Sequence, residues 1–240
     1  NDLCAHVFGF LSLRPARHYF YYHWQHHKFT GNPELDSELQ PGLLDLPIET
    51  PIGYLTYISG APFWIDAVSN LFRHALGDCP EVYLPNEDAR RQVTLEARAY
   101  LALYAAVAVL GAKRRAMGTA LYSWWVLPAL MGQPFLRFYL LAEHRGKQRS
   151  PLVYENTRTM MKTHWLYRKL AWFMPFHMEH HAWPSVPFHK LKDAHELLVQ
   201  GAQGEAILDR GEMDPELSGR ANGYITFNYR FLRRLFQTPK

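Results

Sequence analysis

The sequence predicts an integral membrane protein, built as a helical hairpin beneath a polar cap that carries clustered histidines. Hydrophobic residues make up 48% of the chain and aromatic residues 15%, yet the mean hydropathy is only -0.26, which indicates a modest membrane part joined to much polar chain. Two apolar runs, 99–112 and 119–136, follow one another closely. The pattern HxxHH occurs once before these runs, as HWQHH (23–27), and once after them, as HMEHH (177–181).

Length and charge limit the possible classes of protein. At 240 residues the chain can form one sizeable domain or two small ones. Its net charge of +4 and pI near 9.0 suit nucleic acid, anionic lipid or an acidic protein partner, but no nucleic-acid-binding motif supports the first. Two cysteines, Cys4 and Cys79, are too few for a disulfide framework, which favours a reducing compartment. The chain begins with Asn and shows no signal segment, so we interpret it as truncated at its start.

The elements before the hairpin follow from composition. Residues 1–30 are rich in aromatic residues and histidine, and the turn-rich stretch GNPELDSELQPG that follows predicts an ordered loop. The segment 51–72 is largely apolar with one internal charge, Asp66, and we expect it to lie in the membrane interface or to dip in and return. Residues 86–98 are expected to form a charged connector into the first apolar run.

The two apolar runs predict the hairpin itself. Run 119–136 is about long enough to span a bilayer, whereas run 99–112 needs its flanks. The two prolines of run 119–136, Pro128 and Pro134, are better tolerated in a membrane helix than in a soluble one. If both histidine clusters serve one metal centre, an even number of crossings must separate them, and two runs supply two. The basic stretch KRRAMG would then lie in the far turn, against the positive-inside tendency, and buried helices of a soluble protein are the competing interpretation.

Histidine spacing indicates a metal site. Within a helix, spacings of three and four residues place the members of each cluster on neighbouring positions of one face, and neutral imidazole is the commonest metal ligand in proteins. The clusters supply six nitrogen donors, namely His23, His26, His27, His177, His180 and His181. His144, directly after the second apolar run, and His6, before the first cluster, are two further candidate ligands. We assign structural or solvated roles to the other histidines, His18, His74, His164, His189 and His195.

The ligand set favours iron over zinc. A zinc hydrolase usually carries HExxH and three protein ligands, which neither cluster resembles, and eight histidines exceed the needs of one zinc ion. The Glu-x-x-His pairs typical of soluble di-iron bundles are absent from the sequence too. So many nitrogen ligands therefore predict two iron ions held mainly by imidazole, and iron has redox states that suit O2 chemistry.

These motifs resemble the membrane fatty acid desaturase family, the histidine-box di-iron enzymes, over almost the whole chain. YHWQHHKFTGNPELDSEL is similar to that family's second box and its trailing loop, and FYLLAEH is similar to the segment that supplies an isolated histidine ligand. YENTRTM and MPFHMEHHAWPSVPFHKL resemble the third box and its flanks in bacterial-type members.

The resemblance implies an all-α membrane fold under a cytosolic cap that holds two irons. It implies one desaturase-like domain over 1–240, with the first and second boxes in 1–50, membrane and interfacial segments in 51–142, and the cap with the third box in 143–240. It further implies O2-dependent removal of two hydrogens from an acyl lipid, acyl-CoA or acyl-ACP, with electrons from a ferredoxin or cytochrome b5 type donor. The location implied is the cell inner membrane or the endoplasmic reticulum, with the active site facing the cytoplasm. Basic residues of the cap are expected to dock the donor or anionic lipid, or to form a solvated face.

Polar neighbours of the boxes are candidates for orienting the ligands. They are Glu143, Glu155 and Glu179, for which an ordinary solvated or helix-capping role is the alternative. Asn156 and Arg158 are expected to brace the site or to contact a head group.

The start of the chain departs from the family, whose first box has two histidines, most often HxxxH. His6 fits the second member, and the partner position is Asp2, or Asn1 at the longer spacing. We expect Asp2 to be a ligand or to orient one, because carboxylate is a good oxygen ligand for iron. A histidine such as His18, a histidine lost upstream, or an inactive chain are the alternatives.

Other activities use the same scaffold, because a shared fold and site do not decide the outcome. Hydroxylation or ketolation of an alkane, sterol or carotenoid is one alternative. Another is a non-catalytic membrane protein that binds haem or carries metal, which the position of both clusters outside the apolar runs disfavours.

Overall fold

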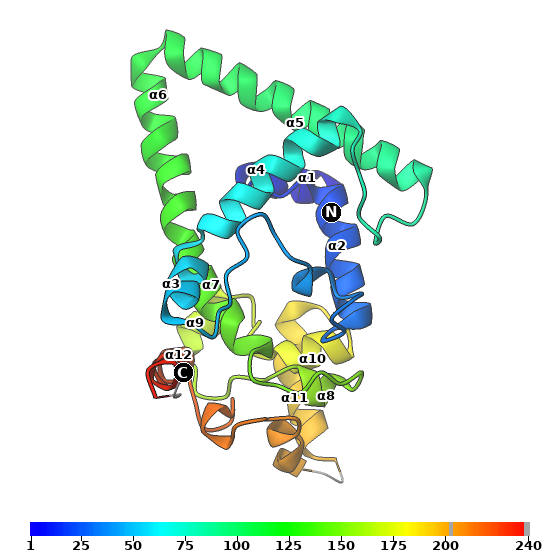
Figure 1. Ribbon diagram of the computed structural model, residues 1–240, viewed down its shortest axis with the longest axis vertical. Coiled ribbons are helices and arrows are strands. Elements are labelled where there is room, and N and C mark those ends of the chain that lie inside the picture. Colours follow the sequence, from blue (N-terminus) through cyan, green and yellow to red (C-terminus); the bar gives the residue numbers. More distant parts are fainter. Residues whose placement is uncertain (202–203, 238–240) are drawn as a thin grey trace.

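The computed structural model of the protein describes residues 1–201 and 204–237, and in that part the regular elements are helices joined by loops, with no β-strand (Figure 1). This confirms the predicted all-α class. The helices are α1 (Asp2–Leu11), α2 (Ala16–Phe29), η1 (Ser37–Leu39), α3 (Pro51–Ser59), α4 (Ala61–Leu76), α5 (Glu87–Lys113), α6 (Arg115–Leu121), the π-helical η2 (Tyr122–Val126), α7 (Leu127–His144), α8 (Val153–Asn156), α9 (Trp165–Leu170), α10 (His177–Ala182), η3 (Phe188–Lys190), α11 (Leu191–Val199), η4 (Gly204–Asp209), η5 (Pro215–Leu217) and α12 (Tyr224–Leu235).

Helix α5 begins earlier than predicted. The side chain of Asn86 accepts a hydrogen bond from the Ala89 amide, and Glu87 and Asp88 occupy the first turn, where acidic residues favour the helix dipole. The expected connector 86–98 therefore forms the first turns of α5 instead. Among the described residues, α5 is the one helix that is long and apolar enough to cross a membrane.

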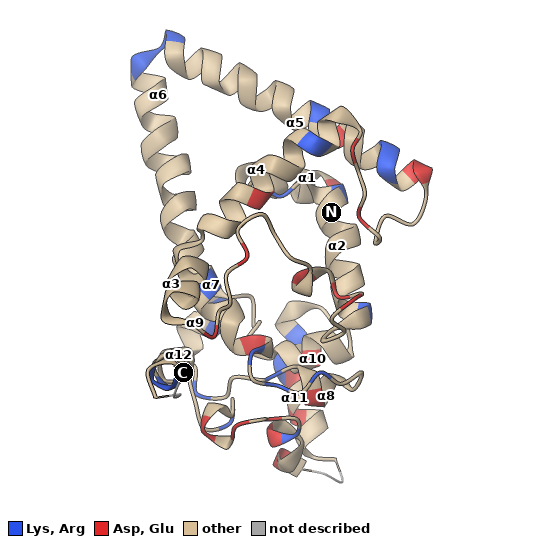
Figure 2. Cartoon of the chain, viewed as in Figure 1, with Lys and Arg blue, Asp and Glu red and all other residues tan. Residues whose placement is uncertain are grey.

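The second predicted run, 119–136, is divided among α6, η2 and α7, which follow one another without a loop. Helix α6 meets α5 at a bend, where a Cβ on Gly118 would lie only 2.7 Å from the Gly111 carbonyl oxygen, so the close approach requires glycine. From this bend the two arms diverge toward the rest of the molecule (Figure 1), and the charged residues of the arms gather near the bend and the far ends (Figure 2).

Helix α1 lies between the two arms. The ring of Phe10 stacks on Tyr104 of α5, with 4.3 Å between ring centroids, and lies 5.4 Å from Trp125 in η2. The Trp125 indole also donates a hydrogen bond to the Leu11 carbonyl. Helix α1 therefore contacts both arms, α5 through Tyr104 and the α6–α7 arm through Trp125.

The segment predicted to lie at the membrane interface or to dip in and return forms two helices, α3 and α4. Gly60 separates them with φ +75°, a left-handed conformation that glycine adopts readily. Gln133 of α7 packs against this turn, and a Cβ on Gly60 would approach the Gln133 Cβ to 2.6 Å. The break therefore fits α3 and α4 against α7.

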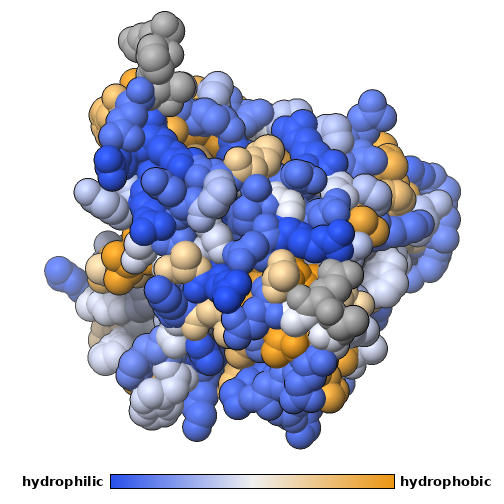
Figure 3. All heavy atoms as spheres, turned by 90° about the horizontal axis from the view of Figure 1, so that it is seen from below, coloured by the Kyte–Doolittle hydropathy of each residue, from blue (hydrophilic) through white to orange (hydrophobic). Residues whose placement is uncertain are grey.

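A hydrophobic core joins the last helix to α3 and α7. Tyr54, Tyr139, Ala142, Phe227 and Phe231 are buried together in it. At the end of the molecule opposite the α5–α6 bend, the surface is mostly hydrophilic (Figure 3).

Candidate metal centre

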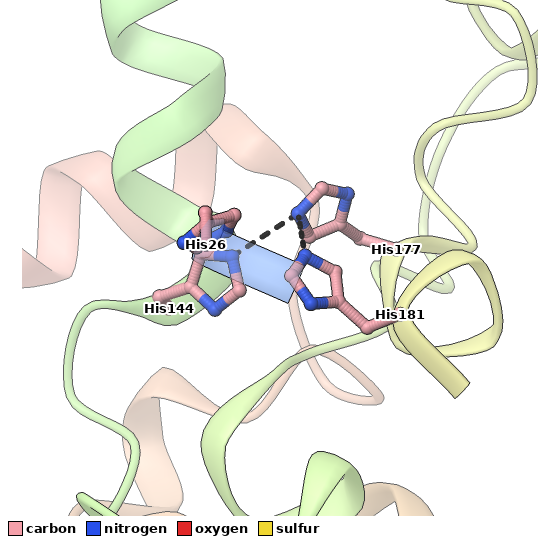
Figure 4. A group of neighbouring side chains, drawn as sticks. All are labelled: His26, His144, His177 and His181. Carbon is pink, nitrogen blue, oxygen red and sulfur yellow. Dashed lines mark hydrogen bonds between the residues drawn. The ribbon is translucent and has the colours of Figure 1, made fainter. Parts of the chain in front are cut away.

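Three helices gather seven of the eight predicted histidine ligands into two groups. The larger group takes His26 from α2, His144 from the end of α7, and His177 and His181 from α10 (Figure 4). Within each group, one ligand atom of every residue lies within 4.8 Å of the others. We call this set the four-histidine group; the three-histidine group consists of His23, His27 and His180.

Each HxxHH cluster is divided between the two groups, which the sequence reasoning did not predict. Residues four apart on a helix differ by about 40° around its axis, whereas residues three apart lie about 60° to the other side. His23 and His27 therefore stay together, and His26 faces the other group. In α10, His177 and His181 stay together, and His180 crosses to the three-histidine group. The groups adjoin, since the rings of His27 and His181 stack with 4.1 Å between centroids.

The ring nitrogens converge on common points. The Nε2 atom of His177 lies 3.1 Å from Nε2 of both His144 and His181, and Nε2 of His27 lies 3.1 Å from Nε2 of both His23 and His180. Two neutral imidazoles can share one proton, but one nitrogen cannot make good hydrogen bonds to two such neighbours at once. A spacing of about 3 Å is instead what two nitrogens adopt when both bind one ion at about 2.1 Å. The donor set therefore fits a metal ion in each group.

Three imidazoles of the four-histidine group are oriented by contacts at their Nδ1 atoms. The Nδ1 atom of His26 lies 2.8 Å from an Asp36 carboxylate oxygen, and Nδ1 of His181 lies 3.1 Å from the Thr30 hydroxyl. The Nδ1 atom of His144 lies 3.1 Å from the backbone carbonyl of Asn156. A proton held at Nδ1 leaves the Nε2 lone pair free for a metal. The sequence reasoning missed Asp36 and Thr30, although both lie in the box-and-loop stretch that it singled out.

Burial keeps most of these imidazoles neutral. It lowers the pKa of His27 to about 2, that of His23 to about 3, and those of His144 and His180 to about 4, with neighbouring histidines adding to the effect. The pKa values of His177 and His181 are also lowered, mainly by burial. Since only a neutral imidazole can bind a metal, the site favours the ligand form at neutral pH.

His26 differs from the other members of its group. Burial alone would lower its pKa, but the carboxylates of Glu38 and Asp36 outweigh burial and raise it. Both carboxylates lie beside the ring, Asp36 at Nδ1 and Glu38 at 3.7 Å from Nε2. His26 is therefore the ligand that most readily keeps a proton at Nδ1.

Among the predicted carboxylates, Glu143 lies at the site. Its Oε2 atom is 3.3 Å from Nε2 of His177, its Oε1 atom is buried without a hydrogen-bond partner in the described structure, and burial raises its pKa. Glu179 belongs to neither group, because its oxygens accept hydrogen bonds from the Thr159 hydroxyl and from His195.

The remaining polar candidates brace the loops around the site. The Asn156 amide donates to the carbonyls of Thr30 and Ser150. Glu155 accepts a hydrogen bond from the Ser150 hydroxyl, and so lies outside both groups. The fully buried guanidinium of Arg158 pairs with Glu212 and donates to the carbonyls of Ala142 and Arg145, which flank Glu143 and His144 at the end of α7.

The two N-terminal candidates lie elsewhere. His6 contacts a carboxylate oxygen of Glu96 in α5 at 2.8 Å, and neither His6 nor Asp2 belongs to the two histidine groups. The Asp2 side chain is 86% exposed and lies 3.9 Å from Arg17. Glu96 also accepts hydrogen bonds from the Arg17 and His18 amides, so it caps the N-terminus of α2. Because α1 packs against α5, its one histidine faces this cap rather than the metal centre.

Two adjoining groups of histidines, on helices next to long apolar arms, form a candidate metal centre with imidazole ligands. The chain belongs to the fatty acid desaturase family, whose family model matches residues 1–208. No curated protein and no solved structure matches it. Membership confirms the predicted family and makes the chain an oxidoreductase. Enzymes of this family are membrane-associated and iron-dependent, and they act on fatty acyl chains with electrons from a donor.

Proposed function

We propose that the chain is an O2-dependent acyl desaturase with one iron in the four-histidine group and a second in the three-histidine group. The observation that carries this proposal is the convergence of seven histidines, from segments far apart in the sequence, on two adjoining points. The Nδ1 atoms of His23, His27 and His177 are buried without hydrogen-bond partners in the described structure, so these rings lack the orienting contacts that His26, His144 and His181 have. His6 and Asp2 are not part of this proposed ligand set.

The reaction balances with an external donor. A CH2–CH2 unit loses two hydrogens and becomes CH=CH, while O2, two electrons and two further protons complete two molecules of water. Iron with O2 supplies an oxidant strong enough for an unactivated C–H bond. The electrons come from a ferredoxin or cytochrome b5 type partner, and the substrate is an acyl lipid, acyl-CoA or acyl-ACP.

The chain's own residues hold the site in shape. Within the four-histidine group, Asp36, Thr30 and the Asn156 carbonyl contact the Nδ1 atoms of the imidazoles and so orient the rings. The Glu143 Oε1 atom, which has no hydrogen-bond partner in the described structure, offers one further ligand or hydrogen-bond acceptor. His26, His177 and His181 are buried and the other four histidines are half-buried, which limits the access of bulk water to the site and so protects the reaction from side paths.

We also propose that residues 1–240 form one domain whose arms, α5 and α6–α7, cross the membrane as a hairpin. Histidines before and after the arms meet at one centre, which requires an even number of crossings. The centre then faces the cytoplasm, in the cell inner membrane or the endoplasmic reticulum.

Cysteine labelling tests the hairpin. In a background with Cys4→Ser and Cys79→Ser, the exposed positions Lys28→Cys and Lys192→Cys should react with an impermeant reagent from one side only. Arg114→Cys, at the bend, should react from the other side. Labelling of the first two positions from opposite faces would rule out the hairpin.

Iron content and product analysis test the activity. The purified protein should hold about two irons, and His181→Ala should lose iron and turnover together, whereas His189→Ala, exposed and outside both groups, should lose neither. Lipid mass spectrometry of a desaturation-deficient host should show a new double bond. An inserted oxygen would instead identify a hydroxylase or ketolase, and stoichiometric zinc with iron available would refute the iron site.

A further inference from the structure

A cavity of about 860 Å³ lies beside the metal centre and has no part in the roles described so far. Its walls come from the α1–α2 junction, the loop 37–49, α3, α4 and the Arg137 turn of α7. Tyr19 lines the cavity, and its ring stacks on His23 with 5.1 Å between centroids and an interplanar angle of 14°. One aromatic ring therefore separates the cavity from the three-histidine group.

Two arginines of this cavity share one aromatic ring. The guanidinium carbon of Arg14 lies 4.9 Å from the ring centroid of Phe63, and that of Arg137 lies 5.0 Å from the same centroid. Arg14 also lies 5.0 Å from the centroid of Tyr19, and Arg137 lies 5.8 Å from that of Tyr57. Ring contacts orient the two guanidinium groups, and that of Arg137 also donates to Gln133 Oε1 at 3.4 Å, but these neutral partners leave both positive charges in place.

Among the described residues, neither Arg14 nor Arg137 forms an ion pair, although other arginines of the same wall do. Arg145 pairs with Glu49, and Arg73 pairs with Asp78. Two positive charges held near one ring repel each other, and an anion between them relieves that repulsion.

The carboxylates of the wall are used elsewhere. Asp66 accepts a hydrogen bond from the Leu43 amide, and Glu81 contacts His74 at 3.0 Å. Glu38 lies on the histidine side, 3.7 Å from His26 Nε2, and Asp45 is exposed. None of these carboxylates pairs with Arg14 or Arg137 in the described structure.

We propose that Arg14 and Arg137 bind the anionic end of the acyl substrate, a carboxylate or a phosphate. The inference rests on the desaturase function proposed above. Because Arg14 is joined to the three-histidine group through Tyr19 and His23, an anchored anionic end lies at a set distance from the metal centre. The distance from the anionic end therefore determines which carbons are desaturated. The new double bond keeps its position relative to that end whatever the chain length.

A chain-length series tests the counting rule. Hosts supplied with 16-, 17- and 18-carbon acids should yield double bonds at one position counted from the carboxyl carbon. A position that stays constant from the methyl end, and so moves relative to the carboxyl carbon, would overturn the proposal while leaving desaturation intact. Absence of any double bond refutes the desaturase function itself, which is a different result.

Binding to the purified protein tests the two arginines without turnover. Stearate, stearoyl-CoA and phosphatidylglycerol present a carboxylate or phosphates, and methyl stearate is the uncharged control. Arg14→Gln and Arg137→Gln should each weaken at least one anionic ligand about ten-fold or more, as expected for a charge-assisted hydrogen bond, without affecting methyl stearate.

The ligand that weakens identifies the source of the anion. Arg149→Gln is the matched control, because it removes one positive charge from the same cavity wall without a contact to Phe63. Equal binding of all four ligands to the parent and both variants would overturn the proposal, as would an equal loss in Arg149→Gln.

Discussion

Asp36→Asn should weaken iron binding about 10- to 100-fold, or about 1.4 to 2.8 kcal/mol, the usual cost of losing a partner behind a metal ligand. The buried Asp36 carboxylate serves three donors: Nδ1 of His26 at 2.8 Å, the Gly31 amide at 2.8 Å and the Glu38 amide at 2.9 Å. Asparagine offers one oxygen and one NH2 group. If the oxygen keeps His26 and Glu38, the NH2 group faces the Gly31 N–H, and a buried donor left without an acceptor costs about 1–3 kcal/mol.

The assay is a chelator titration of the iron-loaded protein, with retained iron measured by mass spectrometry. Asp45→Asn is the matched control, since Asp45 is exposed in the same loop and contacts no histidine of the two groups. Circular dichroism of both variants checks that the helices remain. Equal iron affinity for Asp36→Asn and the parent protein, with helix content preserved, would refute the role assigned to Asp36.

Three further predictions concern stability and the N-terminus. Burial lowers the pKa of Lys147 from 10.5 to about 8, so between pH 8 and 10.5 the unfolded chain binds more protons than the folded chain. The free energy of unfolding, and with it the melting temperature, should therefore rise with pH over this range. In Lys147→Met this rise should be lost. Glu96→Gln should weaken the α2 cap and cost about 1–2 kcal/mol in thermal unfolding, whereas Glu87→Gln, exposed on the same helix, should change stability by less than about 0.5 kcal/mol. Asp2→Ala should leave iron content unchanged, and a loss of iron would return Asp2 to the ligand set.

The sequence was sufficient for the helical class and the family because both leave periodic or clustered signals. Two HxxHH patterns and the isolated His144 point to one centre without any knowledge of the fold. Their division into two groups depends instead on how α2 and α10 face each other, which is a tertiary property. The role of Asp36 could not be predicted for the same reason, since a loop carboxylate becomes a partner of His26 only when the chain turns back on itself.

Local signals also explain where the expected element boundaries moved. The Asn86 cap with acidic residues after it was visible in the sequence, and it extends α5 through the stretch read as a connector. His6 was assigned by analogy to a box spacing, whereas its position depends on the packing of α1 against α5, which leaves it beside Glu96. Spacing alone cannot distinguish a helix that faces the metal centre from one that faces a capping carboxylate.

The exchange of histidines between α2 and α10 has a consequence for biosynthesis. Contacting members of the three-histidine group, His27 and His180, are 153 residues apart, and both arms lie between them in the chain. Neither group is complete until α10 has left the ribosome and the arms have been placed. Under the proposed function, iron can therefore bind only after both arms have been synthesised, and a chain stalled within either arm has no complete histidine group.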